Sequence, residues 1–315
     1  MLIARPSGDG FAVIDGYSRA VRLGEGLAAS GRLADAAMDR TIDALKVCTE
    51  KIAARGAGRV RAVATAACRD AANGDAFIDR VAKETGLKLD AIDADAEAAL
   101  TLAGCTPLLR TGHPKGLMFD IGGGSTEFLW IEVPTRGAPQ IIDMVSLPWG
   151  VVTLAETYGD SDGNAAQDRY AEIVAEIDAQ LAPFDAANAI GPAIAENQVQ
   201  MLGTSGTMTT LGALHLGLRT YDRSRIDGLS MDLAHVRAHA ARLSVMDCQE
   251  RRRLPCVGDG RADLMLMGCA VLTAVTRRWP VPSIRIADRG IREGLILGMI
   301  EADRNPPPAP EPPAT

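Results

Sequence analysis

The hydrophobic positions of this chain follow two spacings that alternate along the sequence. Short apolar runs bounded by glycine, proline and acidic residues predict β-strands. Between these runs, apolar residues recur three and four positions apart, which predicts amphipathic helices. The predicted strands are residues 2–4, 11–14, 20–23, 59–65, 87–92, 117–120, 128–133, 140–147, 199–203 and 283–287. The predicted helices are residues 30–55, 75–85, 94–109, 150–158, 165–187, 232–243, 247–254, 261–278 and 290–302, with one more that follows residue 207 and ends at 214.

Strands and helices occur in a similar order twice, and the second series starts after about residue 117. This order predicts an α/β fold built from a duplicated unit, with a ligand bound between the two halves. We expect residues 1–117 to form the first domain, completed by the C-terminal helix 290–303, and residues 118–289 to form the second. The proline-rich segment 304–315 predicts a disordered tail.

Composition narrows the class of protein. A hydrophobic fraction of 47% and a mean hydropathy of +0.05 indicate a soluble globular chain. The longest apolar run, residues 264–275, is too short to span a bilayer. A net charge of -7 and a pI near 5.2 argue against a nucleic-acid partner, because no basic surplus exists to neutralise many phosphates. Six cysteines without a C-x-x-C pair favour reduced thiols and a cytoplasmic location.

The most specific signal is a glycine-rich turn between two predicted strands. We expect glycine there because the backbone would have to adopt φ > 0, and because a side chain would hold an oxyanion away from the main-chain N–H groups. Asp120 and Glu127 bracket the turn with carboxylates suited to a hydrated Mg²⁺ ion. The turn is therefore predicted to bind phosphate, and a plain glycine-rich hairpin is the alternative. The candidate phosphate-binding residues are Gly122, Gly123, Gly124, Ser125 and Thr126.

A second small-residue turn follows the strand 199–203 and opens a helix. Such a strand-to-helix turn presents N–H groups to an anion at a helix N-terminus, although an ordinary N-capped helix has the same appearance. Arg69 lies just past the carboxyl end of another strand, where ligands gather in α/β sheets. A surface ion pair with Asp70 is its alternative role. The candidate residues of the second turn are Gly203, Thr204, Ser205, Gly206 and Thr207.

Other phosphate and nucleophile motifs are absent from the sequence. No Gly-Lys dipeptide exists, which excludes a Walker A loop. The run G-G-G-S-T-E departs from G-x-G-x-x-G at its last position and is followed by a strand rather than a helix. Ser205 lies in G-T-S-G-T rather than G-x-S-x-G, so a nucleophile elbow is unsupported.

An ordered set of motifs resembles the exopolyphosphatase/guanosine pentaphosphate phosphohydrolase (Ppx/GppA) family, a branch of the actin, sugar kinase and heat-shock ATPase superfamily. The resemblance covers about residues 2–300. The glycine hairpin is shared across the superfamily, whereas the whole ordered set is specific to this family. The motifs are L-G-E-G-L at 23–27, A-T-A-A-C-R-D-A-A-N at 64–73, E-A-A-L at 97–100, D-I-G-G-G-S-T-E at 120–127, G-T-S-G-T at 203–207, R-A-D at 261–263 and D-R-G-I-R-E-G at 288–294.

The resemblance implies two actin-like (ribonuclease H-like) domains that flank a central cleft. It implies Mg²⁺-dependent hydrolysis of the terminal phosphoanhydride of inorganic polyphosphate, guanosine pentaphosphate or both, and it makes a homodimer plausible. Glu97 matches the family's general base, which activates the attacking water. Asp120 and Glu127 match its metal-site carboxylates, and Arg69 and Arg261 match arginines that hold the polyphosphate chain.

Two departures from the family pattern affect these expectations. Asp95 and Ala96 precede Glu97, where the family carries a fuller acidic cluster. The family also opens with a strand and a D-x-G-x-N phosphate loop, which would precede Leu2 and is absent from this sequence. We expect the natural start to lie upstream of Met1. The alternatives are a non-catalytic phosphate or nucleotide sensor, and a sugar kinase or ATPase of the same superfamily.

Overall fold

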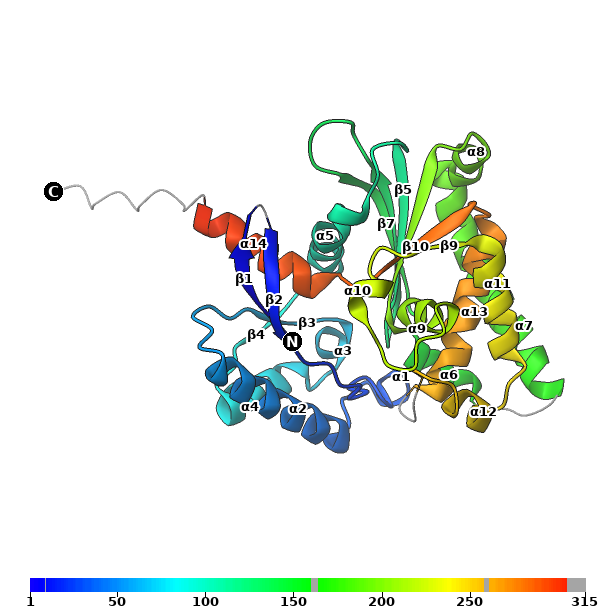
Figure 1. The fold of residues 1–315 in the computed structure, drawn as a ribbon. Coiled ribbons are helices and arrows are strands. Elements are labelled where there is room, and N and C mark those ends of the chain that lie inside the picture. The colour runs from blue at the N-terminus through cyan, green and yellow to red at the C-terminus, as the bar shows by residue number, and fades with distance from the viewer. Residues whose placement is uncertain (9, 160–163, 258–260, 305–315) are drawn as a thin grey trace.

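The computed structural model describes residues 1–8, 10–159, 164–257 and 261–304, in which the chain is a mixed α/β protein with two parts (Figure 1). The predicted tail 304–315 lies outside the described residues, apart from Arg304 at the end of the last helix. No helix within the described ranges is long and apolar enough to cross a membrane.

The first part contains two separate two-stranded sheets. Strand β1 pairs with β2 in antiparallel register, and β3 pairs with β4 in parallel register. A small core of Leu33, Ile42 and Phe77, among others, joins the helices to β3. Its elements are β1 (Leu2–Ser7), β2 (Gly10–Gly16), α1 (Leu27–Ser30), α2 (Asp35–Ala54), β3 (Ala62–Ala64), α3 (Ala66–Asp70), α4 (Gly74–Thr85), β4 (Leu89–Ala91), α5 (Ala94–Cys105) and the 3₁₀ helix η1 (Thr106–Leu108).

The second part is built on one six-stranded sheet with the order β7-β6-β5-β8-β10-β9. Strands β5, β8 and β10 are parallel to one another, whereas β6, β7 and β9 run antiparallel to their neighbours. Its elements are β5 (Lys115–Ile121), β6 (Thr126–Glu132), β7 (Gln140–Leu147), α6 (Val151–Tyr158), α7 (Asn164–Asn188), α8 (Ile190–Ala195), β8 (Val199–Thr204), α9 (Gly206–His215), α10 (Arg223–Ile226), β9 (Ser230–Asp232), α11 (Leu233–Ser244), α12 (Cys248–Arg252), α13 (Ala262–Arg278) and β10 (Ser283–Ala287). The last helix, α14 (Ile291–Arg304), follows β10 but packs against α5, β1 and β2 of the first part (Figure 1).

Both faces of the large sheet are covered, which explains the nearly continuous apolar runs of its central strands. Phe119 and Phe128 belong to the core on one face, which includes residues of α7, α9 and α13. Met118 and Leu129 belong to the core on the other face, where α5 supplies Leu102. Successive residues of a strand point to opposite faces, so each central strand must be apolar throughout.

The predicted duplication is visible in the order of elements. A hairpin, a long helix, a strand, a helix, a strand and a final helix occur in the order β1–β2–α2–β3–α4–β4–α5, and again in the order β6–β7–α7–β8–α9–β10–α14. Further elements are inserted between these, namely α1 and α3 in the first series and α6, α8, α10, β9, α11, α12 and α13 in the second. The two final helices pack closely against each other, and α14 also contacts β1. The domain boundaries themselves stay a prediction.

The strand predicted at residues 20–23 is wrong, because these residues lie in a loop and turn where Arg22 has φ 49°. The strands predicted at 59–65 and 87–92 are shorter than expected, at Ala62–Ala64 and Leu89–Ala91. The prediction missed α1, α3, α8, α10 and β9, each of which is six residues or fewer. Such short segments have too little periodicity to be recognised from sequence alone.

Candidate functional site

The glycine hairpin joins β5 to β6 at one edge of the large sheet, as predicted. The expectation of positive φ was wrong, because none of Gly122, Gly123 and Gly124 has a left-handed backbone. Glycine is required at 122 for a different reason: a Cβ atom there would lie 2.8 Å from the Ser125 carbonyl oxygen. At Gly124 a Cβ would meet nothing within 4 Å, so the space beside that residue is open.

The first residues of α6 form backbone hydrogen bonds to the glycine hairpin. The N–H groups of Val151 and Val152 donate to the carbonyl oxygens of Gly122 and Gly123, at 2.9 and 2.8 Å. Gly150 makes this close approach possible, because a Cβ atom there would lie 2.3 Å from the Gly123 carbonyl. The carbonyls of the hairpin are thereby occupied.

Two amides of the same hairpin differ from its carbonyls in having no partner among the described residues. Within the described part of the chain, the N–H groups of Gly123 and Gly124 donate to no protein acceptor, and both residues are exposed. Exposed main-chain N–H groups in a tight turn form a concavity that attracts anions. The hairpin is therefore suited to bind phosphate through its backbone.

The two predicted hydroxyl donors are already committed to protein groups. Thr126 Oγ1 donates to the Trp149 carbonyl at 2.7 Å, and the Thr126 side chain is buried. Ser125 Oγ donates to Glu127 Oε1 at 2.5 Å. Their predicted contact with phosphate stays a prediction, and in this conformation the amides are the available donors.

Polar side chains form a row across four neighbouring strands at this edge. Asp120 of β5 is paired in register with Glu127 of β6 on one side and with Thr204 of β8 on the other. Glu127 is in turn paired with Ser146 of β7, whose Oγ donates to Glu127 Oε1 at 2.9 Å. Ser146 was missed in the sequence, because the register of a third strand cannot be read from the hairpin motif.

The row places two carboxylates directly opposite each other. Cross-strand partners have Cβ atoms about 5 Å apart, so like charges there destabilise the sheet. Burial raises the pKa of Asp120 to about 7, and the carboxylate of Glu127 adds to this shift. An uncompensated acidic pair of this kind favours a bound cation.

Glu97 lies in the first turn of α5, where Asp93 caps the helix by accepting a hydrogen bond from the Ala96 N–H at 2.8 Å. Burial, followed by the charges of the Glu127 and Asp120 carboxylates, raises the pKa of Glu97 to about 7, and Arg69 opposes this shift. The structure thus brings Glu97 near both hairpin acids although they are far apart in sequence. A carboxylate with a pKa near neutrality is suited to act as a general base.

Arg69 lies in α3 and is anchored at two points. Its Nη1 donates to the Ile92 carbonyl at 2.9 Å, and its Nε lies 3.3 Å from Asp70 Oδ1. The ion pair between Arg69 and Asp70, which was the alternative interpretation of Arg69, is therefore present. The positive charge still acts on Glu97, as the pKa of that carboxyl group shows.

The second predicted turn lies beside the hairpin, because β5 and β8 are parallel neighbours that end at the same edge. Ser205 caps α9 by accepting a hydrogen bond from the Met208 N–H at 3.1 Å, so the N-cap interpretation is also correct. Ser205 has φ 147° and ψ 170°, a conformation that glycine tolerates and other residues adopt at a cost of about 1–3 kcal/mol. Strain of this kind clusters at binding sites.

The other residues of this turn contact Arg261, the Arg289 carbonyl, α13 and Phe119. A Cβ atom on Gly206 would lie 3.4 Å from Arg261 Nη1, so the Arg261 guanidinium lies over the N-terminus of α9. Thr204 Oγ1 donates to the Arg289 carbonyl at 2.9 Å, and Thr207 packs against Gly268 of α13. Gly203 makes room for the ring of Phe119. Arg261 is the side chain of this group best placed to meet an anion.

The donor set can be tested against the implied Mg²⁺ ion. Among the described residues, no three His, Cys, Asp or Glu side chains are grouped so as to hold a metal ion. Mg²⁺ is commonly held through one or two carboxylates, with water and substrate phosphate as the remaining ligands. The opposed carboxylates of Asp120 and Glu127 fit that pattern, and they would not suit a metal that needs three or four side-chain ligands.

Comparisons with known proteins show the family to which this chain belongs. The family model of the Ppx/GppA phosphatase family matches residues 2–303. The chain is 31% identical over 293 residues to Exopolyphosphatase 2 of Mycobacterium tuberculosis, which covers 90% of this chain and 88% of that protein. This chain therefore belongs to the Ppx/GppA phosphatase family.

Solved structures show the same fold. An exopolyphosphatase from Cytophaga hutchinsonii superposes with a TM-score of 0.83 at 24% identity, over 96% of this chain and 94% of that one. An exopolyphosphatase-like protein superposes with a TM-score of 0.80 at 27% identity, over 95% and 93% of the two chains. The mixed α/β fold of the Ppx/GppA family is thus the fold of this protein.

Proposed function

We propose that this protein hydrolyses the terminal phosphoanhydride of inorganic polyphosphate, guanosine pentaphosphate or both, in a reaction that requires Mg²⁺. The observation that carries the proposal is the convergence of Glu97, Asp120 and Glu127 at a hairpin with free amides. The likeness to a protein named Exopolyphosphatase 2 supports the same substrate class.

In the proposed mechanism, the terminal phosphate binds against the N–H groups of Gly123 and Gly124. Asp120 and Glu127 would hold Mg²⁺, which would neutralise charge on the phosphate oxygens. Arg69 and Arg261 contact the rest of the phosphate chain, since guanidinium groups match phosphate oxygens in bidentate geometry. Phosphoryl transfer depends mainly on such positioning and charge neutralisation.

Glu97 acts as the general base in this proposal. With a pKa of about 7, it is partly ionised at neutral pH and can accept a proton from the attacking water. Glu97 lies on α5, whereas Asp120 and Glu127 lie on strands of the large sheet. In this proposal Glu97 therefore faces the bound phosphate from a different side than the two metal-binding acids. We further propose that the two parts of the chain are two actin-like domains with the substrate between them.

The test is phosphate release from polyphosphate, with and without Mg²⁺, by the natural protein and by Glu97→Gln. General-base catalysis is typically worth about 10²–10⁴-fold, so the variant should lose that much of kcat while still binding polyphosphate. Asp95→Asn is the matched control, because Asp95 is an exposed acid in the same first turn of α5 and should be dispensable.

Two results would contradict the proposal. A protein that binds polyphosphate but releases no phosphate, with or without Glu97, is the non-catalytic sensor. A protein that consumes ATP only when an acceptor alcohol is present is a kinase of the same superfamily. Running the assay with polyphosphate, guanosine pentaphosphate and ATP in parallel separates the three activities.

A further inference from the structure

Glu293, in the first turn of α14, is a fully buried carboxylate that the proposed mechanism does not use. Its Oε1 accepts a hydrogen bond from Arg223 Nη2 at 2.6 Å, and its Oε2 accepts one from the Gly290 N–H at 2.9 Å. The same nitrogen of Arg223 also donates to the Asp288 carbonyl at 2.6 Å. A buried charge is tolerated only when it is paired and hydrogen-bonded, so separating Arg223 from Glu293 in the folded protein would be costly.

The pair joins the two parts of the molecule. Helix α10, which carries Arg223, belongs to the second part, because the side chain of Ile226 is buried in the main core. The N–H of Gly228, just after α10, donates to the Ile286 carbonyl of β10 at 2.8 Å. Helix α14 instead packs against α5, β1 and β2 of the first part. Figure 1 shows α10 close to the place where the chain leaves β10 and enters α14.

The other end of α10 binds the same segment. The carboxylate of Asp227 accepts a hydrogen bond from Arg289 Nε at 2.9 Å and one from the Asp288 N–H at 3.0 Å. Both ends of α10 are therefore bonded to the residues where α14 begins. We call Arg223, Asp227, Asp288, Arg289 and Glu293 the α10 clamp. Since hydrogen bonds are directional, the α10 clamp fixes the position of the first turn of α14.

The first turn of α14 in turn fixes α5. A Cβ atom on Gly294 would lie 2.0 Å from the Leu100 carbonyl oxygen, so the two helices meet backbone to backbone. Leu100 lies one turn after Glu97 in α5, and Thr101 Oγ1 donates to the Glu97 carbonyl at 2.8 Å. No side chain separates the helices at this point to absorb a shift. The first turn of α5 must therefore move together with the start of α14.

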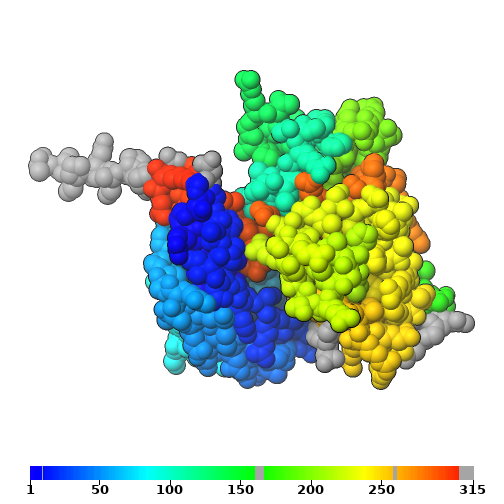
Figure 2. Space-filling model, in the orientation of Figure 1, coloured from blue at the N-terminus to red at the C-terminus, as the bar shows by residue number. Residues whose placement is uncertain are grey.

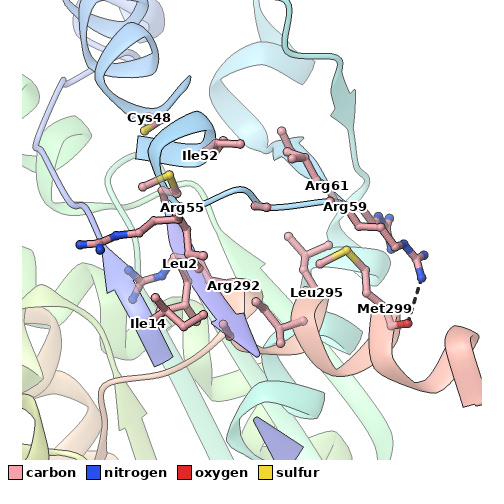
Figure 3. Close-up of a pocket in the computed structure, with 18 of the residues that line it drawn as sticks. Leu2, Ile14, Cys48, Ile52, Arg55, Arg59, Arg61, Arg292, Leu295 and Met299 are labelled. Carbon is pink, nitrogen blue, oxygen red and sulfur yellow. Dashed lines mark hydrogen bonds between the residues drawn. The ribbon is translucent and has the colours of Figure 1, made fainter. Parts of the chain in front are cut away.

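The other contacts of the two helices are less directional. Helix α5 meets the large sheet through apolar side chains such as Ala98 and Leu102. In α14, Leu295 and Met299 line a cavity of about 600 Å³, as Figure 3 shows. Apolar contacts do not fix direction, and packed helices can slide over one another by small amounts. Among the contacts of these helices, the α10 clamp is therefore the one best suited to hold them in a single position.

We propose that Arg223 is a positioning residue for Glu97, which it holds in place through Glu293, α14 and α5. Asp120 and Glu127 lie on strands of the sheet to which α10 is bonded. The α10 clamp thus ties the general base to the same frame as the two metal-site acids. A misplacement of about 1 Å in an active site can lower the rate about 10²-fold. The inference rests on the proposed function, in which Glu97 is the general base.

The test removes both charges of the pair at once. Removing Arg223 alone would leave Glu293 charged, buried and unpaired, which is strongly destabilising. Replacing a buried ion pair with neutral side chains of similar size is often neutral for stability, so the test protein is Arg223→Met/Glu293→Gln. Glutamine keeps an oxygen for the Gly290 N–H. Arg225→Met is the matched control, because Arg225 is an exposed arginine of the same helix.

We expect the double variant to release phosphate from polyphosphate with a kcat about tenfold or more below that of the natural protein. Its KM should stay within about twofold, because the hairpin amides and Arg261 belong to the second part and are not displaced. The unfolding midpoint should stay within a few degrees, and Arg225→Met should match the natural protein in every respect. A folded double variant with the natural kcat would overturn the proposal.

A conservative variant separates the two hydrogen bonds from the guanidinium group itself. Both bonds of Arg223 start from one nitrogen, so a lysine ammonium with three N–H donors can form both. We expect Arg223→Lys to keep kcat within about threefold of the natural value, since it preserves the donors that position α14. A loss as large as that of the double variant would show that Arg223 does not act through these two bonds.

A further readout does not depend on phosphatase activity. The carboxyl groups are titrated by NMR without Mg²⁺, and the Glu97 signal is identified by its absence in Glu97→Gln. The pKa of Glu97, raised to about 7 by burial and by the nearby acids, should fall by about one pH unit or more in the double variant and not in Arg225→Met. An unchanged titration would overturn the positioning role. A shifted titration in a protein that releases no phosphate would support the positioning role and count against the proposed function alone.

Discussion

Two acids that face each other across neighbouring strands define the chemistry of the site at the scale of residues. Asp120 and Glu127 are cross-strand partners, and burial raises the pKa of Asp120 to about 7. A carboxyl group whose pKa is higher in the folded than in the unfolded state holds its proton longer when folded. Its contribution to stability is therefore lost as the pH rises from about 4 to about 7.

Replacing Asp120 with asparagine should therefore stabilise the fold above neutral pH. We expect Asp120→Asn to raise the free energy of unfolding by about 1–2 kcal/mol at pH 8, after allowance for solvent screening, and by little at pH 4. Chemical denaturation at both pH values measures this difference. Mg²⁺ should stabilise the natural protein but not the variant, and equal stabilisation of both would place the ion elsewhere.

Ser146 supports Glu127 from the third strand of the row. Its hydroxyl donates to Glu127 Oε1 at 2.9 Å, which fixes the direction of the carboxylate. We expect Ser146→Ala to lower the affinity for Mg²⁺ about tenfold or more. This is the range typical for the loss of a group that orients a metal ligand. Titration of activity against Mg²⁺ concentration measures this, and a Ser146→Thr variant that keeps the hydroxyl should recover most of the affinity. An unchanged Mg²⁺ dependence in Ser146→Ala would show that Ser125 alone suffices.

The residues of the hairpin were predictable, whereas their supports were not. Asp120, Glu127 and the three glycines lie in one local motif. Ser146 and Gly150 act on that motif from 19 or more residues away along the chain. Their contact depends on the register of β7, which shifts at Trp130/Ile131, and a register shift of this kind leaves no signal in the hydrophobic pattern.

At the scale of elements, α5 and α14 cross at a point where glycine allows backbone contact. A Cβ atom on Gly104 would lie 2.1 Å from the Gly290 carbonyl oxygen, and one on Gly294 would lie 2.0 Å from the Leu100 carbonyl oxygen. The crossing matters for the site because α5 carries Glu97 in its first turn. Moving α5 away from α14 would change the position of Glu97.

Gly294→Ala should therefore destabilise the protein, although alanine usually favours a helix. Overpacking typically costs about 1–3 kcal/mol, and here the methyl group would meet backbone that cannot rotate away. Gly298→Ala on the same helix is the matched control, because its Cβ would meet nothing within 4 Å and should stabilise the helix by up to about 1 kcal/mol. Thermal unfolding of the two variants should shift in opposite directions, and a parallel shift would contradict the close crossing.

Long, apolar elements were predictable from the sequence, and short ones were not. Strands β5, β6, β7, β8 and β10 of the large sheet, and helices such as α4 and α13, occur within a few residues of their predicted places. The three-residue strands β3, β4 and β9 were overestimated or missed. In such strands, pairing with neighbours decides the structure rather than local preference.

At the scale of the whole molecule, one loop of the first part contacts α13 and α6, two helices of the second part that begin beside the candidate phosphate-binding turns. Arg22 makes two hydrogen bonds to the Asp263 carboxylate, at 2.9 and 2.8 Å, and Asp263 lies next to Arg261 at the start of α13. The N–H of Gly26 donates to Glu156 of α6 at 2.7 Å. Figure 2 shows these two parts meeting side by side, with the N-terminal elements in blue and the second part in yellow and green. The sequence motif at 23–27 was part of the family pattern, but its link to α6 required the folded chain.

Breaking the Arg22–Asp263 ion pair should affect the position of the two parts relative to each other more than it lowers the stability of either part. The pair is about one-third exposed on each side, so its contribution to stability is at most about 1 kcal/mol. We expect Asp263→Asn to raise the KM for polyphosphate about three- to tenfold and to leave the unfolding midpoint within a few degrees. The matched control is Glu25→Gln, which removes the Arg40–Glu25 ion pair within the first part and should leave KM unchanged.

If both variants bind polyphosphate equally well, the Arg22–Asp263 pair does not hold the two parts in their binding arrangement. If Asp263→Asn instead unfolds at a much lower temperature, the pair supports the fold of the loop rather than the approach of Arg261 to the substrate.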